Sequence, residues 1–289
     1  MRTWVAVVAF MGAVSSAQAA DFMDLPVLRG SFRDAPAPQG NWDRWYAGGQ
    51  FGYTGANLDF SHASASLTDY MLRNGVLQNS VHEWSLLEGK NASGIGFGGF
   101  VGRNWQWEDA VIGFEVNYSN LRGIRNGSNG EMYLAIINPP GDTPPDGHTY
   151  RYNTRLSGSA TGEIKDALTL RARAGWDAGT FMPYMFGGIA LGRVNVSRTA
   201  TLDISKDDIN VLPVPVGSVV TTNVTPNPAT KTEGGVDSIT GGYTVGLGTE
   251  MLVAGNLFLR AEWEYIRLLK VKDVAFSMNS ARVGVGYRF

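Results

Sequence analysis

The sequence predicts an all-β protein, an eight-stranded antiparallel up-and-down transmembrane β-barrel with long extracellular loops. Three observations predict this fold. Apolar and polar residues alternate over eight segments of about ten residues, the length of a tilted strand that crosses a bilayer. The connections between these segments alternate between short and long. Aromatic residues gather at both ends of the segments, where a spanning strand meets the membrane–water boundary.

The predicted strands begin after residue 43 and continue to the last residue. They cover residues 44–54, 93–105, 110–119, 167–177, 181–194, 242–251, 257–267 and 280–289. In the last of them, the apolar Val285, Tyr287 and Phe289 alternate with glycine and arginine. The segment 181–194 is apolar on both faces, so alternation leaves its register open.

The connections indicate how the strands lie across the membrane. Hairpin turns near residues 105–109, 178–180 and 253–256 are short. The links 55–91, 121–160 and 197–238 are long, and the link 268–277 is of intermediate length. Short periplasmic turns and long extracellular loops are typical of outer-membrane barrels.

The aromatic residues fall into two groups. The short-turn end holds Trp42, Trp45, Trp105, Trp107, Trp176, Tyr287 and Phe289, and the long-loop end holds Tyr53, Tyr118, Tyr243 and Tyr265. Two girdles with an aliphatic band between them favour a membrane. Alternation alone would also fit a soluble barrel that turns its apolar face inward.

The chain begins with a secretory signal. Arg2 precedes the apolar run 4–14, and Ala17-Gln18-Ala19 fits the small-x-small cleavage pattern. Such a run is too short to be a transmembrane helix. We therefore expect a signal peptide over residues 1–19, a periplasmic N-terminal segment over 20–43 and the barrel over 44–289.

Composition limits the chemistry. The formal net charge is −2, so no strong field favours nucleic acid. Cysteine is absent, which excludes disulfides and thiolate metal sites. The histidines are His62, His82 and His148, and all three fall in predicted loops, which are polar by default. We expect no enzyme activity, no catalytic residue, no metal site and no cofactor.

The polar faces of the strands provide the candidate site. If the apolar faces contact lipid, the lumen receives Glu115, Arg171, Arg173, Glu250, Arg260, Glu262, Glu264 and Arg282. We expect these carboxylates and guanidiniums to pair and plug the barrel, because an unpaired buried charge is costly and an eight-stranded barrel is narrow. Lumen-facing glycines such as Gly48 and Gly246 keep a narrow polar pore open as an alternative.

The strand segments also resemble a known family. Taken in order, "WYAGGQFGYT", "GFGGFVGRNWQW", "LTLRARAGW" and "ARVGVGYRF" are similar to the eight-stranded outer-membrane β-barrel family that includes opacity proteins and the OmpA barrel. The small major outer-membrane proteins of alphaproteobacteria are the most similar. The resemblance covers residues 44–289 and implies a location in the bacterial outer membrane. It also implies that Tyr287 and Phe289 form the signal that the barrel assembly machinery reads.

The expected function is that of a structural outer-membrane protein with surface loops and a charge-paired lumen. A small porin that passes ions or small solutes and an adhesin that binds through the long loops are the alternatives. The expected partners are outer-membrane lipid, the barrel assembly machinery and an extracellular partner at the loops. Nucleic acid is not expected.

Overall fold

The structure, a computed structural model, describes residues 41–289 apart from 74, 79–84 and 212–217. The predicted signal peptide and residues 20–40 of the predicted periplasmic segment lie outside the described residues. The elements are β1 (Trp45–Asp59), α1 (Ala65–Leu72), β2 (Lys90–Trp107), β3 (Ala110–Ile137), β4 (His148–Trp176), β5 (Phe181–Asn210), β6 (Val219–Asn223), β7 (Thr230–Ala254), β8 (Leu257–Val271) and β9 (Val274–Arg288).

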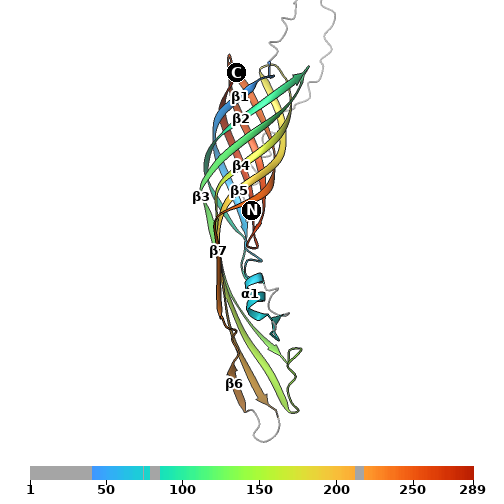
Figure 1. Ribbon diagram of the computed structural model, residues 1–289, viewed down its shortest axis with the longest axis vertical. Coiled ribbons are helices and arrows are strands. Elements are labelled where there is room, and N and C mark those ends of the chain that lie inside the picture. Colours follow the sequence, from blue (N-terminus) through green and yellow to red (C-terminus); the bar gives the residue numbers. More distant parts are fainter. Residues whose placement is uncertain (1–40, 74, 79–84, 212–217) are drawn as a thin grey trace, which may run out of the picture. The chain divides into compact units, whose positions relative to one another are not determined.

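Eight strands close into a ring of antiparallel neighbours, wound around one axis (Figure 1). Their order is β1-β2-β3-β4-β5-β7-β8-β9, and β9 pairs again with β1. Closure gives every spanning strand two hydrogen-bonding neighbours, as lipid requires of backbone groups. The predicted eight-stranded antiparallel barrel is therefore confirmed.

Side chains alternate between the outside and the inside of the ring. On β8, the outward Leu259 and Trp263 are 42% and 47% exposed, whereas the inward Arg260 and Glu262 are 3% and 5% exposed. Apolar residues outside and charged residues inside are the arrangement of a barrel that faces lipid.

Inward aromatic residues set the register that alternation leaves open in β5. Met182, Tyr184 and Phe186 are buried inside the ring. Glycines on β7 make room for two of them, because a Cβ on Gly246 would lie 2.3 Å from Phe186 Cζ and one on Gly248 would lie 2.5 Å from Tyr184 Cζ.

The two longest predicted loops, 121–160 and 197–238, are mostly strand, which the sequence did not predict. Pairing of β2 with β3 reaches only Phe97↔Asn120, but β3 continues to pair with β4 up to Ile137↔Arg151. The strands β4, β5 and β7 also continue beyond the ring. We call residues 124–137, 148–164, 195–210, 219–223 and 230–238 the extension sheet (Figure 1).

A bulge in β4 marks the boundary between the ring and the extension sheet. Lys165 is an extra residue in β4 between the pairs Ile164↔Val194 and Asp166↔Arg193. Residues of β4 that point inward therefore have odd numbers in the ring, on the C-terminal side of the bulge, as Arg171 does. They have even numbers in the extension sheet, on the N-terminal side, as Ile164 and Leu156 do. The inner face also changes there from charged to apolar, so most apolar residues of β4 keep even numbers on both sides of the bulge. Thr154, Gly158 and Gly162 lie among these even positions and weaken the contrast from which a strand is predicted.

The link between β8 and β9 is a tight turn rather than the predicted loop 268–277. It consists of Lys272 and Asp273, whose φ angles are 50° and 61°. Two successive residues with positive φ are typical of a two-residue hairpin turn.

Apolar residues fill the ring where the extension sheet begins. This core includes Leu58, Phe60, Leu121, Ile124, Ile164, Val194, Leu268 and Phe276. Beside it, Leu67 and Met71 of α1 pack with Leu156 and Leu202 on the inner face of the extension sheet. No helix among the described residues is long and apolar enough to cross a membrane.

Candidate functional site: the charged lumen

All eight charged residues assigned to the lumen lie inside the ring, and Arg282 is the most exposed of them at 8%. They come from five strands. Glu115 is on β3, Arg171 and Arg173 on β4, Glu250 on β7, Arg260, Glu262 and Glu264 on β8, and Arg282 on β9. Ion pairs join them across the ring.

Arg171 is at the centre of this network. Its guanidinium pairs with Glu115, its direct cross-strand neighbour, so the β3–β4 register sets that contact. Its Nη1 also lies 3.2 Å from Glu262 Oε2 and 3.2 Å from Glu264 Oε1. One cation therefore joins β4 to carboxylates on β3 and β8.

Glu250 lies between the other two central arginines. Its Oε1 accepts hydrogen bonds from Arg173 Nη1 at 2.8 Å and from Arg260 Nη2 at 2.6 Å. Arg260 Nη2 also donates to Glu115 Oε2 at 2.7 Å. Shared partners of this kind place an opposite charge beside each buried charge of the set, although Arg173 Nη2 and Arg260 Nη1 have no hydrogen-bond partner among the described residues.

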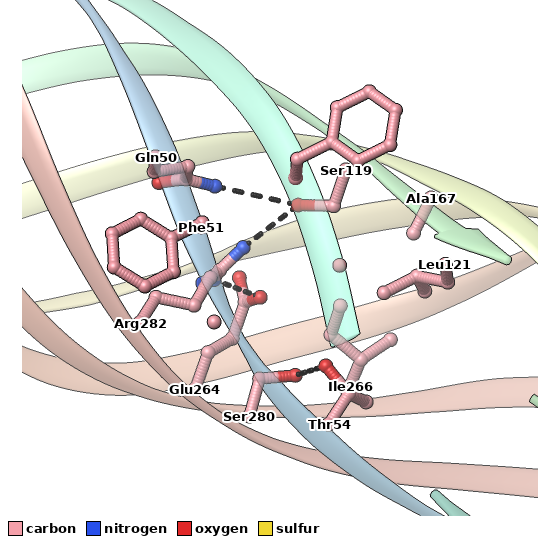
Figure 2. A pocket seen from close by; sticks show the side chains of 13 residues that line it. Gln50, Phe51, Thr54, Ser119, Leu121, Ala167, Glu264, Ile266, Ser280 and Arg282 are labelled. Carbon is pink, nitrogen blue, oxygen red and sulfur yellow. Dashed lines mark hydrogen bonds and ion pairs between the residues drawn. The ribbon is translucent and has the colours of Figure 1, made fainter. Parts of the chain in front are cut away.

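Arg282 extends the network toward neutral polar residues (Figure 2). It pairs with Glu264, and its Nη1 donates to Ser119 Oγ at 3.0 Å. Gln50 Nε2 donates to the same hydroxyl at 3.3 Å. Figure 2 shows the side chains of Gln50 and Arg282 directed toward Ser119 from two different strands.

Aromatic rings cover the flat faces of the central guanidiniums. Arg171 lies 4.1 Å from the Phe186 ring centre, Arg173 lies 3.9 Å from that of Tyr184, and Arg260 lies 3.7 Å from that of Phe100. Sequence reasoning missed these aromatic residues. The available signal was the row of glycines opposite them, which leaves room for rings inside a narrow barrel.

Little space remains between these side chains. The cavity beside Gln50, Ser119 and Arg282 has a volume of about 10 Å³, which is about the minimum for one water molecule. The space beside the lumen-facing glycines is occupied by their neighbours. A Cβ on Gly48, for example, would lie 2.4 Å from Phe100 Cζ.

Trp42 closes the short-turn end of the ring, and its assignment to the aromatic girdle was wrong. The side chain is fully buried and packs with Val111 and Met182. Its Nε1 donates to Asp177 Oδ1 at 3.1 Å, and the Arg288 guanidinium lies 4.8 Å from its ring centre. Trp42 precedes the first strand, so no strand periodicity could give its direction.

The other aromatic residues of the short-turn end are exposed on the outside. These are Trp45, Trp105, Trp107, Trp176, Tyr287 and Phe289. The backbone N–H of Phe289 donates to the carbonyl of Trp45 at 2.9 Å, so the last residue is bonded to the first strand. At the other end, Tyr53, Tyr118 and Tyr243 are exposed and Tyr265 is half-buried.

The described histidines have separate partners. His62 Nδ1 lies 2.8 Å from Ser61 Oγ, and His148 Nδ1 lies 2.7 Å from Asp208 Oδ1. His82 is outside the described residues. Across the part of the chain that the structure describes, no three histidine, aspartate or glutamate side chains are grouped to hold a metal ion.

Comparison with known proteins gives a family and several solved structures that match the chain. The outer membrane protein beta-barrel domain matches residues 6–289. The N-terminal β-barrel domain of Pseudomonas aeruginosa OprF is 12% identical, with a TM-score of 0.34 and coverage of 86% of this chain and 98% of that chain. Ail, the attachment invasion locus protein of Yersinia pestis, is 9% identical, with a TM-score of 0.30 and coverage of 85% and 99%. Neisserial surface protein A is 13% identical, with a TM-score of 0.29 and coverage of 85% and 97%. No curated protein matches the chain.

Proposed function

Because the chain belongs to the outer membrane protein beta-barrel domain family and is located in the bacterial outer membrane, we propose that it is a structural barrel with a closed lumen. Its ring anchors the extension sheet on the outer side of the membrane. On the resemblance of its strand segments, we further propose that its nearest relatives are small major outer-membrane proteins of alphaproteobacteria.

The packing of the lumen is the observation that carries this proposal. Four arginines and four glutamates neutralise one another inside the ring, and the cavity beside Arg282 measures about 10 Å³. A conducting pore needs a continuous path with sites from which an ion can leave again. Buried ion pairs backed by aromatic rings oppose such a path.

Planar-bilayer recording of the refolded protein tests the closed lumen. We expect no steady conductance from the unaltered chain. The matched variants are Glu262→Gln in the lumen and Glu163→Gln on the extension sheet. Steady conductance whose ion selectivity changes with Glu262→Gln but not with Glu163→Gln would establish the alternative, a small porin.

Adhesion is a second candidate, and the extension sheet favours it. Tyr133 and Ile137 are 64% and 63% exposed on β3. Tyr133, Arg155 and Asp203 line a groove of about 450 Å³ on the same sheet. Tyrosine and arginine are enriched among the residues that carry binding energy at interfaces. Adhesion is tested by shortening the β3–β4 hairpin, with the residues beyond the Gly127↔Thr161 pair removed. Unchanged binding of the shortened variant to host cells would rule out adhesion through this hairpin.

The remaining partners follow from the same proposal. Lipid contacts the outward face of the ring, and the barrel assembly machinery reads the strand that ends in Tyr287 and Phe289. We propose no catalytic role, since His62 and His148 pair with different groups and neither lies in the lumen. Nucleic acid is not a proposed partner, because the net charge is only −2.

A further inference from the structure

Arg198 on β5 joins three separate segments at one mouth of the ring. Its Nη1 donates to the carbonyl of Ala63 at 3.1 Å and to Asp273 Oδ2 at 2.6 Å. Its Nη2 donates to Glu233 Oε2 at 2.9 Å. Ala63 leads into α1, Asp273 is in the β8–β9 turn and Glu233 is on β7, so one side chain that is only 5% exposed connects all three.

The helix α1 makes two contacts of its own with this cluster. Ser66 Oγ donates to Asp273 Oδ2 at 2.7 Å. Lys231 Nζ lies 3.2 Å from the ring centre of Tyr70, and it also lies 3.4 Å from Glu233 Oε1. The cluster is therefore a continuous set of polar contacts between the helix and the strands around it.

The same helix has little stability of its own. It has eight residues, its N-cap Ser64 makes no side-chain capping bond, and its first turn carries no acidic residue. Helices this short are marginal in water unless tertiary packing supports them. Leu67 and Met71 supply that packing against the inner face of the extension sheet. The position of α1 therefore depends on its packing and polar contacts with the strands, not on the stability of the helix itself.

We infer that residues 60–73 form a lid, with α1 at its centre, and that Arg198 is the latch that holds the lid closed over the apolar inner face of the extension sheet. Loss of the negative charges on Asp273 and Glu233 releases the latch. Opening exposes apolar residues that the lid now covers: Leu156, Ala200, Leu202 and Ile204.

The charges around the latch give the direction of the pH effect. Burial alone would raise the pKa of Asp273, but hydrogen bonds from Ser66 and Arg198 hold it below its ordinary value of 3.8. The hydrogen bond from Arg198, together with nearby Lys231 and Lys272, holds the pKa of Glu233 below its ordinary value of 4.5. Lys270 also lowers the pKa of Asp273.

These lowered values mean that the charged carboxylates stabilise the closed lid. The stabilisation is complete above the ordinary values of both groups and is lost as the pH falls through the lowered ones. Arginine keeps its proton throughout this range. In acid, Arg198 would therefore be left as a buried cation without its carboxylate partners, which favours opening of the lid.

The absence of native cysteine permits a direct test with single introduced thiols. Ala200→Cys places a thiol beneath the lid, where Ala200 is fully buried. Thr199→Cys places one on the opposite face of the same strand, where Thr199 is half-buried. The probe is 2,2′-dithiodipyridine, which also reacts in acid, and the measurement is the ratio of the two labelling rates in the refolded full chain.

With the lid closed at about pH 7, we expect the thiol at position 200 to react about tenfold or more slowly than the one at position 199. Arg198→Met should bring the ratio close to one. Lowering the pH through the lowered pKa values of Asp273 and Glu233 should move the ratio in the same direction without Arg198→Met, because protonation removes the charges that hold Arg198. Arg193→Met, an exposed arginine on the same strand, should leave the ratio unchanged. Heat-modifiable gel migration reports whether the barrel is intact.

Two results would overturn the inference. A thiol at position 200 that reacts freely at neutral pH in the otherwise unaltered chain would mean that the lid is open. Continued protection of that thiol in an intact Arg198→Met barrel would mean that Arg198 is not the latch. If Arg198→Met does not fold, the double variant Asp273→Asn/Glu233→Gln takes its place, since it removes the two negative charges and keeps the arginine. Continued protection of the thiol at position 200 in that double variant would also overturn the inference.

Discussion

Glu115 and Arg171 are direct cross-strand neighbours on β3 and β4, and 2% and 1% of their respective surfaces are exposed. Removal of one member of such a buried pair leaves the other without compensation and costs about 3–5 kcal/mol. Arg171→Met should therefore lower the free energy of unfolding by about that amount. Urea titration followed by heat-modifiable migration measures it.

Arg193→Met is the matched control, because Arg193 pairs with Asp166 but its side chain is 45% exposed. Exposed pairs contribute about 0–1 kcal/mol. Equal losses in the two variants would contradict the view that the lumen network stabilises the ring. The double variant Glu115→Gln/Arg171→Met should lose less than the sum of the two single variants, since the two residues are in contact.

Two adjacent glycines on β1 test whether the lumen is full. A Cβ on Gly48 would lie 2.4 Å from both Phe100 Cζ and the carbonyl oxygen of Val285, whereas the nearest atom to a Cβ on Gly49 is 3.9 Å away. Gly48→Ala should destabilise the barrel by about 1–3 kcal/mol through overpacking. Gly49→Ala should be close to neutral. Similar unfolding midpoints in urea for both variants would show that the interior has spare room.

The spanning part of the fold could be predicted because lipid and lumen impose opposite polarities on alternate residues. That rule gives the direction of Glu262 and Trp263 on β8 from their parity alone. The rule gives no direction for residue types, such as aromatic residues, that occur both on the lipid face and in the lumen. Tyr184 and Phe186 of β5 turn inward only because Gly248 and Gly246 lie opposite them, and that relation between strands is absent from the pattern of one segment.

The extension sheet could not be predicted for a different reason. In the extension sheet, beyond the extra residue Lys165, even positions of β4 face inward, and this inner face packs on α1 and is apolar. Most apolar residues therefore stay at even positions along β4, but Thr154, Gly158 and Gly162 among them weaken the contrast between the two faces. The direction of Trp42 was equally inaccessible, since its environment consists of Asp177 and Arg288 from distant strands.

Trp42 should stabilise the short-turn end of the barrel. Trp42→Ala removes a fully buried side chain and the hydrogen bond to Asp177, and such truncations cost about 3–5 kcal/mol. Trp42→Phe keeps most of the packing and should lose less. The unfolding midpoint in urea distinguishes the two variants. Equal midpoints for Trp42→Ala and the unaltered chain would mean that the Trp42 side chain does not stabilise the ring.

Asp207 should make the attachment of β6 dependent on pH. Its carboxylate accepts hydrogen bonds from Thr221 Oγ1 at 2.8 Å, Asn153 Nδ2 at 2.8 Å and Arg151 Nη2 at 3.0 Å. These bonds hold the pKa of Asp207 below its ordinary value of 3.8. The charged form therefore stabilises the contact above that pH, and the contact weakens as the pH falls through the lowered pKa.

Amide hydrogen exchange measures this effect. Protection of Thr221 and Thr222 on β6 should decrease in acid relative to protection of β9. In Asp207→Asn, the protection should be low at neutral pH and nearly independent of pH. The same pH dependence in Asp207→Asn and the unaltered chain would assign the effect to other groups.

The C-terminal aromatic residue should matter for assembly more than for stability. The Phe289 side chain is 62% exposed on the outside, so it contributes little interior packing, and its backbone N–H rather than its side chain bonds to Trp45. Phe289→Ser should therefore reduce the amount of barrel in the outer membrane several-fold, while the refolded variant unfolds at nearly the same urea concentration. Phe97→Ser, an outward aromatic with 58% exposure on β2, is the control for loss of lipid contact. Normal outer-membrane levels of Phe289→Ser, or an equal loss for Phe97→Ser, would argue against recognition of the terminal residue by the assembly machinery.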